Sequence, residues 1–121
     1  MNARPRLALT CGEPAGIGPD LCVLIGASLP VLGADCEIEC LADESLLRGR
    51  AAQLGIDLPA GGAFRIRHVP LSAPVTPGRL DARNARWVLS LLDMALAGCR
   101  SGQYQAMVTA PVQKSIINDA G

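Results

Sequence analysis

Apolar positions follow two alternating periods along the chain. Short apolar or alternating runs at 6–11, 36–41, 64–69 and 106–109 predict four strands. Longer segments between them predict helices over 20–29, 44–54 and 81–100, with a further helix starting near Val112. Strands that alternate with helices indicate an α/β protein, here three α/β/α layers around a mainly parallel sheet.

Turn and cap residues define the ends of these elements. Pro19 and Asp20 suit the first turn of a helix, because proline has no N–H to lose there and a carboxylate favours the positive helix start. Asp43 is suited to cap the helix at 44–54, which we expect to stop at Gly55. Gly102 should end the long helix, and the proline-rich stretch 70–78 should form an irregular connection.

The helices differ in how their apolar residues are distributed. The segment 20–29 is apolar nearly all round, so we expect that helix to be largely buried. The long helix has one apolar face, formed by Ala85, Val88, Leu89, Leu92, Ala95, Leu96 and Cys99.

The composition supports one small packed domain. Half of the 121 residues are hydrophobic, and eleven basic residues balance eleven acidic ones. A neutral chain with one Trp, one Tyr and one Phe has neither the basic excess nor the aromatic platforms expected of a nucleic-acid-binding protein. Without a signal peptide or a long apolar span, we expect a cytoplasmic protein with no membrane partner.

Cysteine and histidine residues give little support for a metal site in this chain. The five cysteines are odd in number and form no CxxC pair, so we interpret them as reduced thiols that fill the core. Cys36 and Cys40 are poorly spaced for zinc. The single histidine, His68, is expected to be structural or to face solvent rather than to act in catalysis.

The last residues suggest an incomplete domain. The sequence stops at Gly121 with a new element under way, and four strands would leave an exposed parallel edge. We therefore expect a fragment rather than a finished domain.

A glycine-rich turn is the first candidate for a binding site. Gly12, Gly16 and Gly18 follow the first predicted strand in GEPAGIGPD at 12–20. Glycine allows a sharp turn and close approach to a ligand, and the helix start behind it presents unpaired N–H groups to an anion or a nucleotide. Glu13 is suited to hold a substrate or ribose hydroxyl. The spacing is neither GxGxxG nor a Walker loop, so a purely structural turn is an equal alternative.

The segment VTAPVQKSIIND at 108–119 is the second candidate. It follows the fourth predicted strand, and open α/β sheets bind ligands at the carboxyl ends of strands. Thr109 offers a hydroxyl, Lys114 a cation and Asn118 an amide, and the last two share a helical face. These groups suit a phosphate or carboxylate, although a solvated helix start explains them equally well.

Together these segments resemble the 4-hydroxythreonine-4-phosphate dehydrogenase family of vitamin B6 biosynthesis. The resembling stretches are GEPAGIGPD at 12–20, the LD, NA and WV pairs within 80–88, and VTAPVQKSIINDAG at 108–121. The first also resembles the turn of isocitrate and isopropylmalate dehydrogenases, whose fold this family shares. The resemblance covers residues 1–121 as roughly the first third of a family member, without a complete second domain.

The resemblance implies a reaction and a set of site residues. The whole enzyme would use NAD or NADP to oxidise 4-phosphooxy-L-threonine to 2-amino-3-oxo-4-phosphooxybutanoate, which decarboxylates to 3-amino-2-oxopropyl phosphate. It would be a homodimer with a divalent metal (zinc, magnesium or cobalt) whose histidine ligands this chain lacks. The residues on the cofactor side would be Gly12, Glu13, Pro14, Gly16 and Gly18. The residues on the substrate side would be Thr109, Lys114 and Asn118.

Two alternatives remain beside this hypothesis. One is a paralogous dehydrogenase of a related phosphorylated hydroxy acid, such as a phosphothreonate or a phosphoerythronate. The other is a non-catalytic module that binds a nucleotide or an anion. No residue of this chain is assigned as catalytic, and we expect the 121 residues alone to be inactive.

Overall fold

One parallel sheet organises the molecule. The computed structural model describes residues 4–32, 35–58 and 62–112. Its strands are β1 (Arg6–Thr10), β2 (Glu37–Ala42), β3 (Phe64–His68) and β4 (Ala106–Thr109). All three pairings are parallel, and the strand order is β3-β2-β1-β4.

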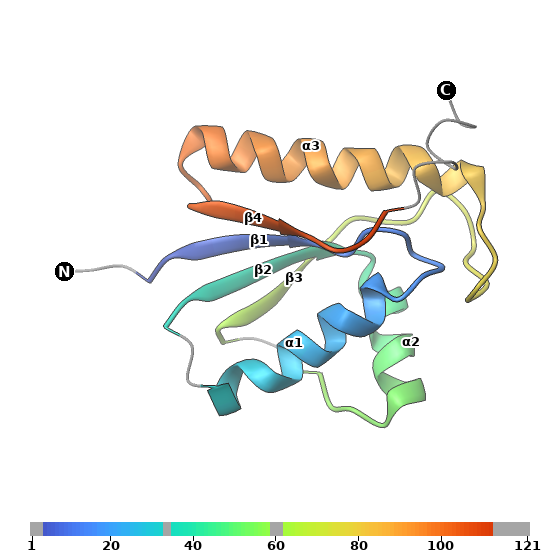
Figure 1. Cartoon of the computed structure of the whole chain (residues 1–121), viewed down its shortest axis with the longest axis horizontal. Helices are drawn as coiled ribbons and strands as arrows, with labels where there is room; N and C mark the ends of the chain where they lie inside the picture. The colour runs from blue at the N-terminus through green and yellow to red at the C-terminus, as the bar shows by residue number, and fades with distance from the viewer. Residues whose placement is uncertain (1–3, 33–34, 59–61, 113–121) are drawn as a thin grey trace.

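Helices cover both faces of this sheet. Helices α1 (Gly18–Leu32) and α2 (Glu44–Leu54) lie on one face, and α3 (Ala85–Ser101) crosses the other (Figure 1). A short 3₁₀ turn (Ala82–Asn84) leads into α3. The predicted three-layer α/β/α arrangement with a parallel sheet is thus confirmed.

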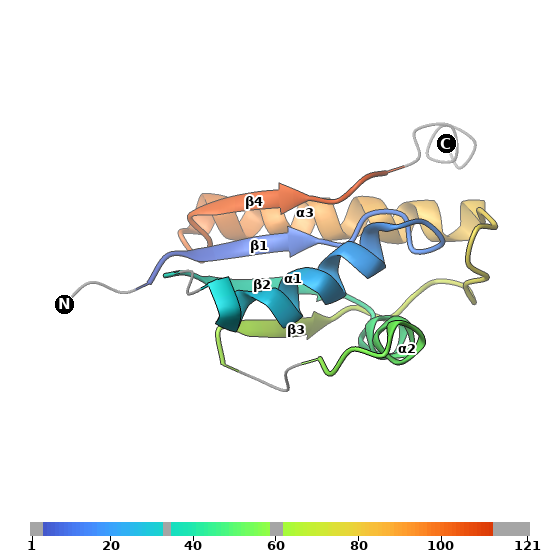
Figure 2. The ribbon, with the colours of Figure 1, turned by 60° about the horizontal axis from the view of Figure 1, so that its bottom comes forward.

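The order of the strands creates a switch point beside β1. Strands β1, β2 and β3 succeed one another toward one edge, with α1 and α2 as their connections. Helix α3 then passes over the opposite face and brings β4 to the other side of β1 (Figure 2). In open α/β sheets, the carboxyl ends of the strands at such a reversal are where ligands bind.

The predicted caps are confirmed. The Asp43 carboxylate accepts a hydrogen bond from the Leu46 N–H at 3.1 Å and so begins α2. Gly55 and Gly102 end α2 and α3 with φ angles of 69° and 84°, in the left-handed region that glycine adopts without strain. Pro19 lies in the first turn of α1, as expected.

Helix α1 is largely buried over 20–29, as expected, except at two leucines. Cys22, Val23 and Leu29 face the sheet and are buried. Leu21 and Leu24 are 37% and 46% exposed. An all-apolar helix carries no information about which side the sheet covers, and here the sheet covers only one.

The buried face of α3 is predicted in part: Ala85, Val88 and Ala95 are buried as expected, but the face is rotated from the prediction. Leu89 and Leu96 are 39% and 43% exposed, whereas Trp87 and Leu91 are buried. The indole N–H of Trp87 donates to the Val69 carbonyl at 2.9 Å, on the chain that leaves β3. This bond turns the helix so that Trp87 and Leu91, rather than Leu89 and Leu96, face the sheet.

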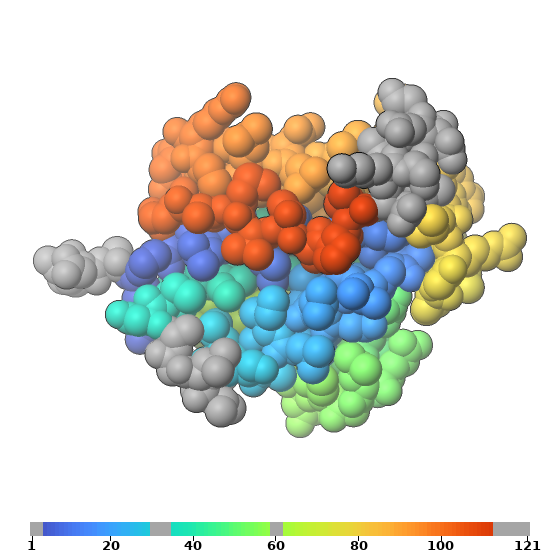
Figure 3. Space-filling model, in the orientation of Figure 1, coloured from blue at the N-terminus to red at the C-terminus, as the bar shows by residue number. Residues whose placement is uncertain are grey.

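The exposed parallel edge that four strands predict is present, and strand β4 forms it. Within the described residues it pairs only with β1, and Val108 is half exposed. The surface of β4 adjoins that of α1 (Figure 3), the helix that carries the exposed residues Leu21 and Leu24. No helix in the described part of the chain is long and apolar enough to cross a membrane.

Candidate functional site

The two segments singled out from the sequence meet at the switch point. The glycine-rich turn leaves β1, and residues 110–112 leave β4 beside it (Figure 2). The Ala110 N–H donates to the Thr10 carbonyl at 3.0 Å, and the Glu13 N–H donates to the Pro111 carbonyl at 3.0 Å. Two segments about a hundred residues apart are therefore joined by backbone hydrogen bonds at the edge where ligands bind.

Two glycines of the turn are required by the fold itself. Gly12 has a φ of +68°, and a Cβ there would overlap the Pro111 carbonyl oxygen. A Cβ on Gly18 would overlap the carbonyl oxygen of Cys11. These positions allow the turn to pack against β4 and against its own strand, whatever ligand is bound.

Gly16 differs from the other two glycines. It is only partly buried, and the nearest atom to a Cβ there would be the Glu13 carbonyl oxygen at 3.5 Å, an ordinary contact distance. The packing therefore leaves room for a side chain at Gly16. A glycine that the fold does not require is the one best placed to allow a ligand close to the backbone.

Glu13 and Pro14 shape the turn from inside. Glu13 is buried, its carboxylate accepts from the Ala15 N–H at 3.1 Å, and its carbonyl accepts from the Gly16 N–H at 3.1 Å. Pro14 is fully buried. Both residues hold the turn closed on itself, which gives Glu13 a structural contact besides the expected contact with a ligand hydroxyl.

The start of α1 has free donors, as expected. Among the described residues, the amides of Ile17, Gly18 and Asp20 donate to no acceptor. Such amides carry the positive end of the helix dipole and favour an anion or the polar groups of a nucleotide. Ile17 is exposed, so this end of the helix is accessible from solvent.

Arg50, on α2, reaches the same turn and was missed by the sequence analysis. Its guanidinium donates to the carbonyls of Pro14 and Gly16 and to the carboxylate of Asp20. The signal that could have found it is its position: Arg50 shares the buried face of α2 with Leu47 and Ala51. A cation on an apolar helix face needs partners, and here the turn supplies them.

The substrate-side residues are only partly described. Thr109 is exposed at the end of β4, in register with Thr10 on β1. The Thr10 side chain is buried, and its hydroxyl has no hydrogen-bond partner in the part of the chain that the structure describes. Lys114 and Asn118, together with the helix expected beyond Val112, fall outside the described residues.

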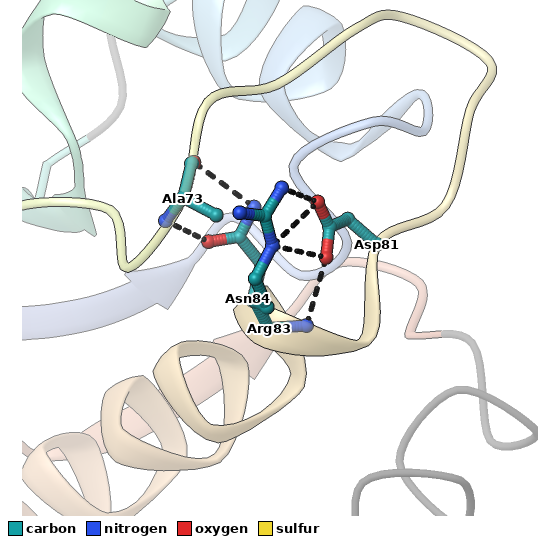
Figure 4. A network of polar contacts seen from close by, with 4 residues as sticks. All are labelled: Ala73, Asp81, Arg83 and Asn84. Carbon is teal, nitrogen blue, oxygen red and sulfur yellow. Dashed lines mark hydrogen bonds and ion pairs between the residues drawn. The ribbon is translucent and has the colours of Figure 1, made fainter.

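An ordered loop borders the turn. Buried Asn84 binds Ala73 in both directions: its amide oxygen accepts from the Ala73 N–H at 2.9 Å, and its amide nitrogen donates to the Ala73 carbonyl at 3.1 Å (Figure 4). Arg83 binds the Asp81 carboxylate, and these hydrogen bonds lower the pKa of Asp81 to about 2. The Gly78 N–H then donates to the Ala15 carbonyl at 2.8 Å and ties the loop to the turn. An open hollow of about 260 Å³ lies in this loop and is lined by Pro74, Thr76, Arg79, Leu80, Asp81 and Arg83.

The thiols and the histidine have structural surroundings. Burial raises the pKa of Cys11, and a hydrogen bond with Cys22, together with burial, raises that of Cys40. These thiols therefore stay protonated and are weak nucleophiles. His68 accepts a hydrogen bond from the Glu44 N–H at 3.0 Å, which confirms its structural role at the start of α2. No group of three or more His, Cys, Asp or Glu side chains among the described residues is arranged to hold a metal ion.

These features define the class of protein: an open, parallel α/β protein with a glycine-rich turn and a helix start at its switch point. A family model described as "Pyridoxal phosphate biosynthetic protein PdxA" matches residues 30–121. The chain therefore belongs to the PdxA family of pyridoxal phosphate biosynthetic proteins.

Individual relatives agree with this assignment. The chain is 51% identical, over 131 aligned residues, to the 4-hydroxythreonine-4-phosphate dehydrogenase of Chromobacterium violaceum, covering 100% of this chain and 39% of that protein. A crystal structure of 4-hydroxythreonine-4-phosphate dehydrogenase from Klebsiella pneumoniae superposes with a TM-score of 0.81 at 25% identity, over 97% of this chain and 40% of that one. A terephthalate 1,2-cis-dihydrodiol dehydrogenase from Burkholderia xenovorans also matches, with a TM-score of 0.73 at 27% identity over 96% of this chain and 37% of that one. The chain thus spans about two fifths of the length of these relatives.

Proposed function

We propose that this chain forms the cofactor side, and part of the substrate side, of an NAD- or NADP-dependent dehydrogenase that oxidises 4-phosphooxy-L-threonine. The observation that carries the proposal is the joining of 12–20 and 108–112 at the switch point, in a chain of the PdxA family. The relatives' name supports the choice of substrate.

The proposal divides the site between the two segments. Gly16 and the amides at the start of α1 would contact the cofactor directly, with their positions set by the other turn residues, Gly12, Glu13, Pro14 and Gly18. The substrate side would be formed by Thr109, Lys114 and Asn118. A positive helix start suits the phosphates of a dinucleotide, so the chemistry of the turn fits such a cofactor.

The reaction would proceed in two parts. A nicotinamide held by the turn would supply the hydride acceptor, taking the hydride from the alcohol carbon while the hydroxyl proton would be released to water. The resulting β-keto acid then loses its carboxylate as CO2, and the electron pair of the broken C–C bond forms an enolate that takes up a proton. This chain's turn would position the cofactor for the first part.

A divalent metal does not fit the described residues. Zinc, magnesium or cobalt would need several His, Asp or Glu side chains together, and the described part of the chain offers no such group. We therefore assign no metal-dependent step to the residues of this chain, and propose that the metal ligands belong to another part of the enzyme.

We also propose that the working enzyme is a cytoplasmic homodimer.

A chimaeric enzyme tests the proposal. The corresponding N-terminal region of the Chromobacterium violaceum relative is replaced by this chain, and formation of NADH or NADPH from 4-phosphooxy-L-threonine is followed by absorbance. We expect turnover by the chimaera and none by the relative's remainder alone. A folded chimaera that binds neither cofactor nor substrate would contradict the proposal.

A specific observation favours a second candidate function. The Burkholderia xenovorans dehydrogenase has the same fold but is named for a different substrate, so the fold alone does not determine the substrate. The second candidate is therefore a dehydrogenase of another phosphorylated hydroxy acid. A panel containing phosphothreonate and phosphoerythronate separates the two dehydrogenase hypotheses, because each predicts a different preferred substrate. Binding of NAD by this chain without turnover in any chimaera would instead favour a non-catalytic binding module.

A further inference from the structure

Arg50 is a charged side chain in a place where charges are rarely found. It lies on α2, and its side chain is only 7% exposed. A guanidinium does not lose its proton, so burial has to be compensated by hydrogen-bond acceptors and a negative charge. Because it lies next to the glycine-rich turn, its hydrogen bonds can affect the conformation of that turn.

The acceptors of the Arg50 guanidinium are Gly16 itself and one residue on either side of it in the sequence. One guanidinium nitrogen donates to the Pro14 carbonyl at 3.1 Å. The other donates to the Gly16 carbonyl at 3.3 Å and to an Asp20 carboxylate oxygen at 2.8 Å. Arg50 therefore joins the turn and the first turn of α1 in a single fork of hydrogen bonds, a geometry that the planar guanidinium allows and an ammonium does not.

This arrangement sets the direction of the turn. The carbonyls of Pro14 and Gly16 are directed toward the Arg50 guanidinium on α2, which compensates their partial negative charges beside the start of α1. The ion pair with Asp20 also neutralises a carboxylate within the first turn of that helix. An unpaired carboxylate there would repel a phosphate, so the pair preserves the positive character of the helix start.

We propose that Arg50 is a positioning residue for cofactor binding, which holds the glycine-rich turn in the conformation that accepts the cofactor's phosphates. In this proposal Arg50 acts through the turn rather than on the cofactor, because its buried guanidinium is already bonded to the turn and to Asp20. The inference rests on the proposed function. It adds to that function a residue on α2, which lies outside both the glycine-rich turn at 12–20 and the segment that begins at residue 108.

Three variants in the chimaeric enzyme test the inference. Arg50→Met keeps most of the side-chain volume and removes the fork and the charge. Arg50→Lys keeps the charge that pairs with Asp20 but cannot reach both carbonyls. Arg48→Met is the matched control, because Arg48 lies on the same helix in an exposed ion pair with Glu44.

We expect Arg50→Met to raise the KM for NAD or NADP by about tenfold or more, with a change in kcat of less than about threefold. Arg50→Lys should give an intermediate KM, and Arg48→Met should leave both constants unchanged. If Arg50→Met prevents folding of the chimaera, the Arg50→Lys enzyme supplies the comparison. An unchanged KM in Arg50→Lys and Arg50→Met, or an equal rise in Arg48→Met, overturns the inference.

Hydrogen exchange in the 121-residue chain gives an independent readout. The amides of Ala15 and Gly16 bind Glu13 within the turn. In Arg50→Met they should exchange about tenfold faster or more, while the amide of Leu9 in β1 keeps its rate. Unchanged exchange of the turn overturns the inference even where the enzyme is active. An inactive chimaera with Arg50 intact instead counts against the proposed function alone.

Discussion

Substitution of Gly12 by alanine measures how far the fold itself requires the glycines of the turn. At a φ of +68°, an L-residue costs about 1–2 kcal/mol more than glycine. The new Cβ would also overlap the Pro111 carbonyl and lie 2.8 Å from that of Ala110, and the backbone shift that relieves such crowding costs about 1–3 kcal/mol. Together these effects should lower the free energy of unfolding by about 2–5 kcal/mol, a large share of the stability of a small domain.

Urea unfolding followed by Trp87 fluorescence is a suitable assay, because the Trp87 side chain is buried in the native chain. Gly49→Ala is the control: nothing lies within 4 Å of a Cβ there, and the change in helix α2 should stabilise by about 0.5–1 kcal/mol. Gly16→Ala should leave the unfolding midpoint near that of the wild type and weaken cofactor binding in the chimaera. A wild-type midpoint for Gly12→Ala, or an equal loss for Gly16→Ala, would refute this division of the glycines.

Three other features of the structure lead to predictions. Thr10→Val removes a buried hydroxyl that lacks a partner among the described residues, and should raise the free energy of unfolding in urea by about 1 kcal/mol; a decrease would show that the hydroxyl does bind a partner. Leu24 and Leu96 are exposed apolar residues on helices that cover opposite faces of the sheet, whose edge strand is β4. The 121-residue chain should therefore self-associate in sedimentation experiments, and the double change to lysine should favour the monomer. Equal association of both proteins would contradict this role. Burial and a hydrogen bond to Glu39 raise the pKa of Tyr104 above its usual 10.0. The protonated phenol therefore stabilises the fold fully below pH 10, and this stabilisation is lost as the pH rises through the higher pKa of the folded chain. Tyr104→Phe should flatten the pH dependence of the free energy of unfolding in this alkaline range, and an unaltered profile would rule the contribution out.

Elements with local signals could be predicted closely from the sequence. Helix α2 has the predicted bounds, because Asp43 and Gly55 bond to the helix's own backbone at its two ends. Strand β4 also has the predicted bounds, between the turn after α3 and Pro111. Such signals act over a few residues and need no knowledge of the rest of the fold.

The errors concern which side of a helix is covered. The rotation of α3 depends on the Trp87 indole reaching Val69, and on Tyr104, whose ring lies where a side chain on Gly98 would be. These partners are separated in sequence or lie beyond the helix end, so helical periodicity alone could not reveal them. The exposure of Leu21 on α1 similarly depends on which side of that helix the sheet covers.

The site shows the same division between local and distant causes. The turn at 12–20 and the segment after β4 approach each other because β1 and β4 are neighbours, and the carboxyl ends of parallel strands share one edge of the sheet. Which of their residues face a ligand does not follow, because a glycine can serve a ligand or a neighbouring carbonyl equally well in sequence. The carbonyl of Pro111 beside Gly12, and the open space beside Gly16, separate these uses in the folded structure. A glycine-rich turn can thus be recognised from its amino-acid sequence, but residues from other strands and helices determine its contacts.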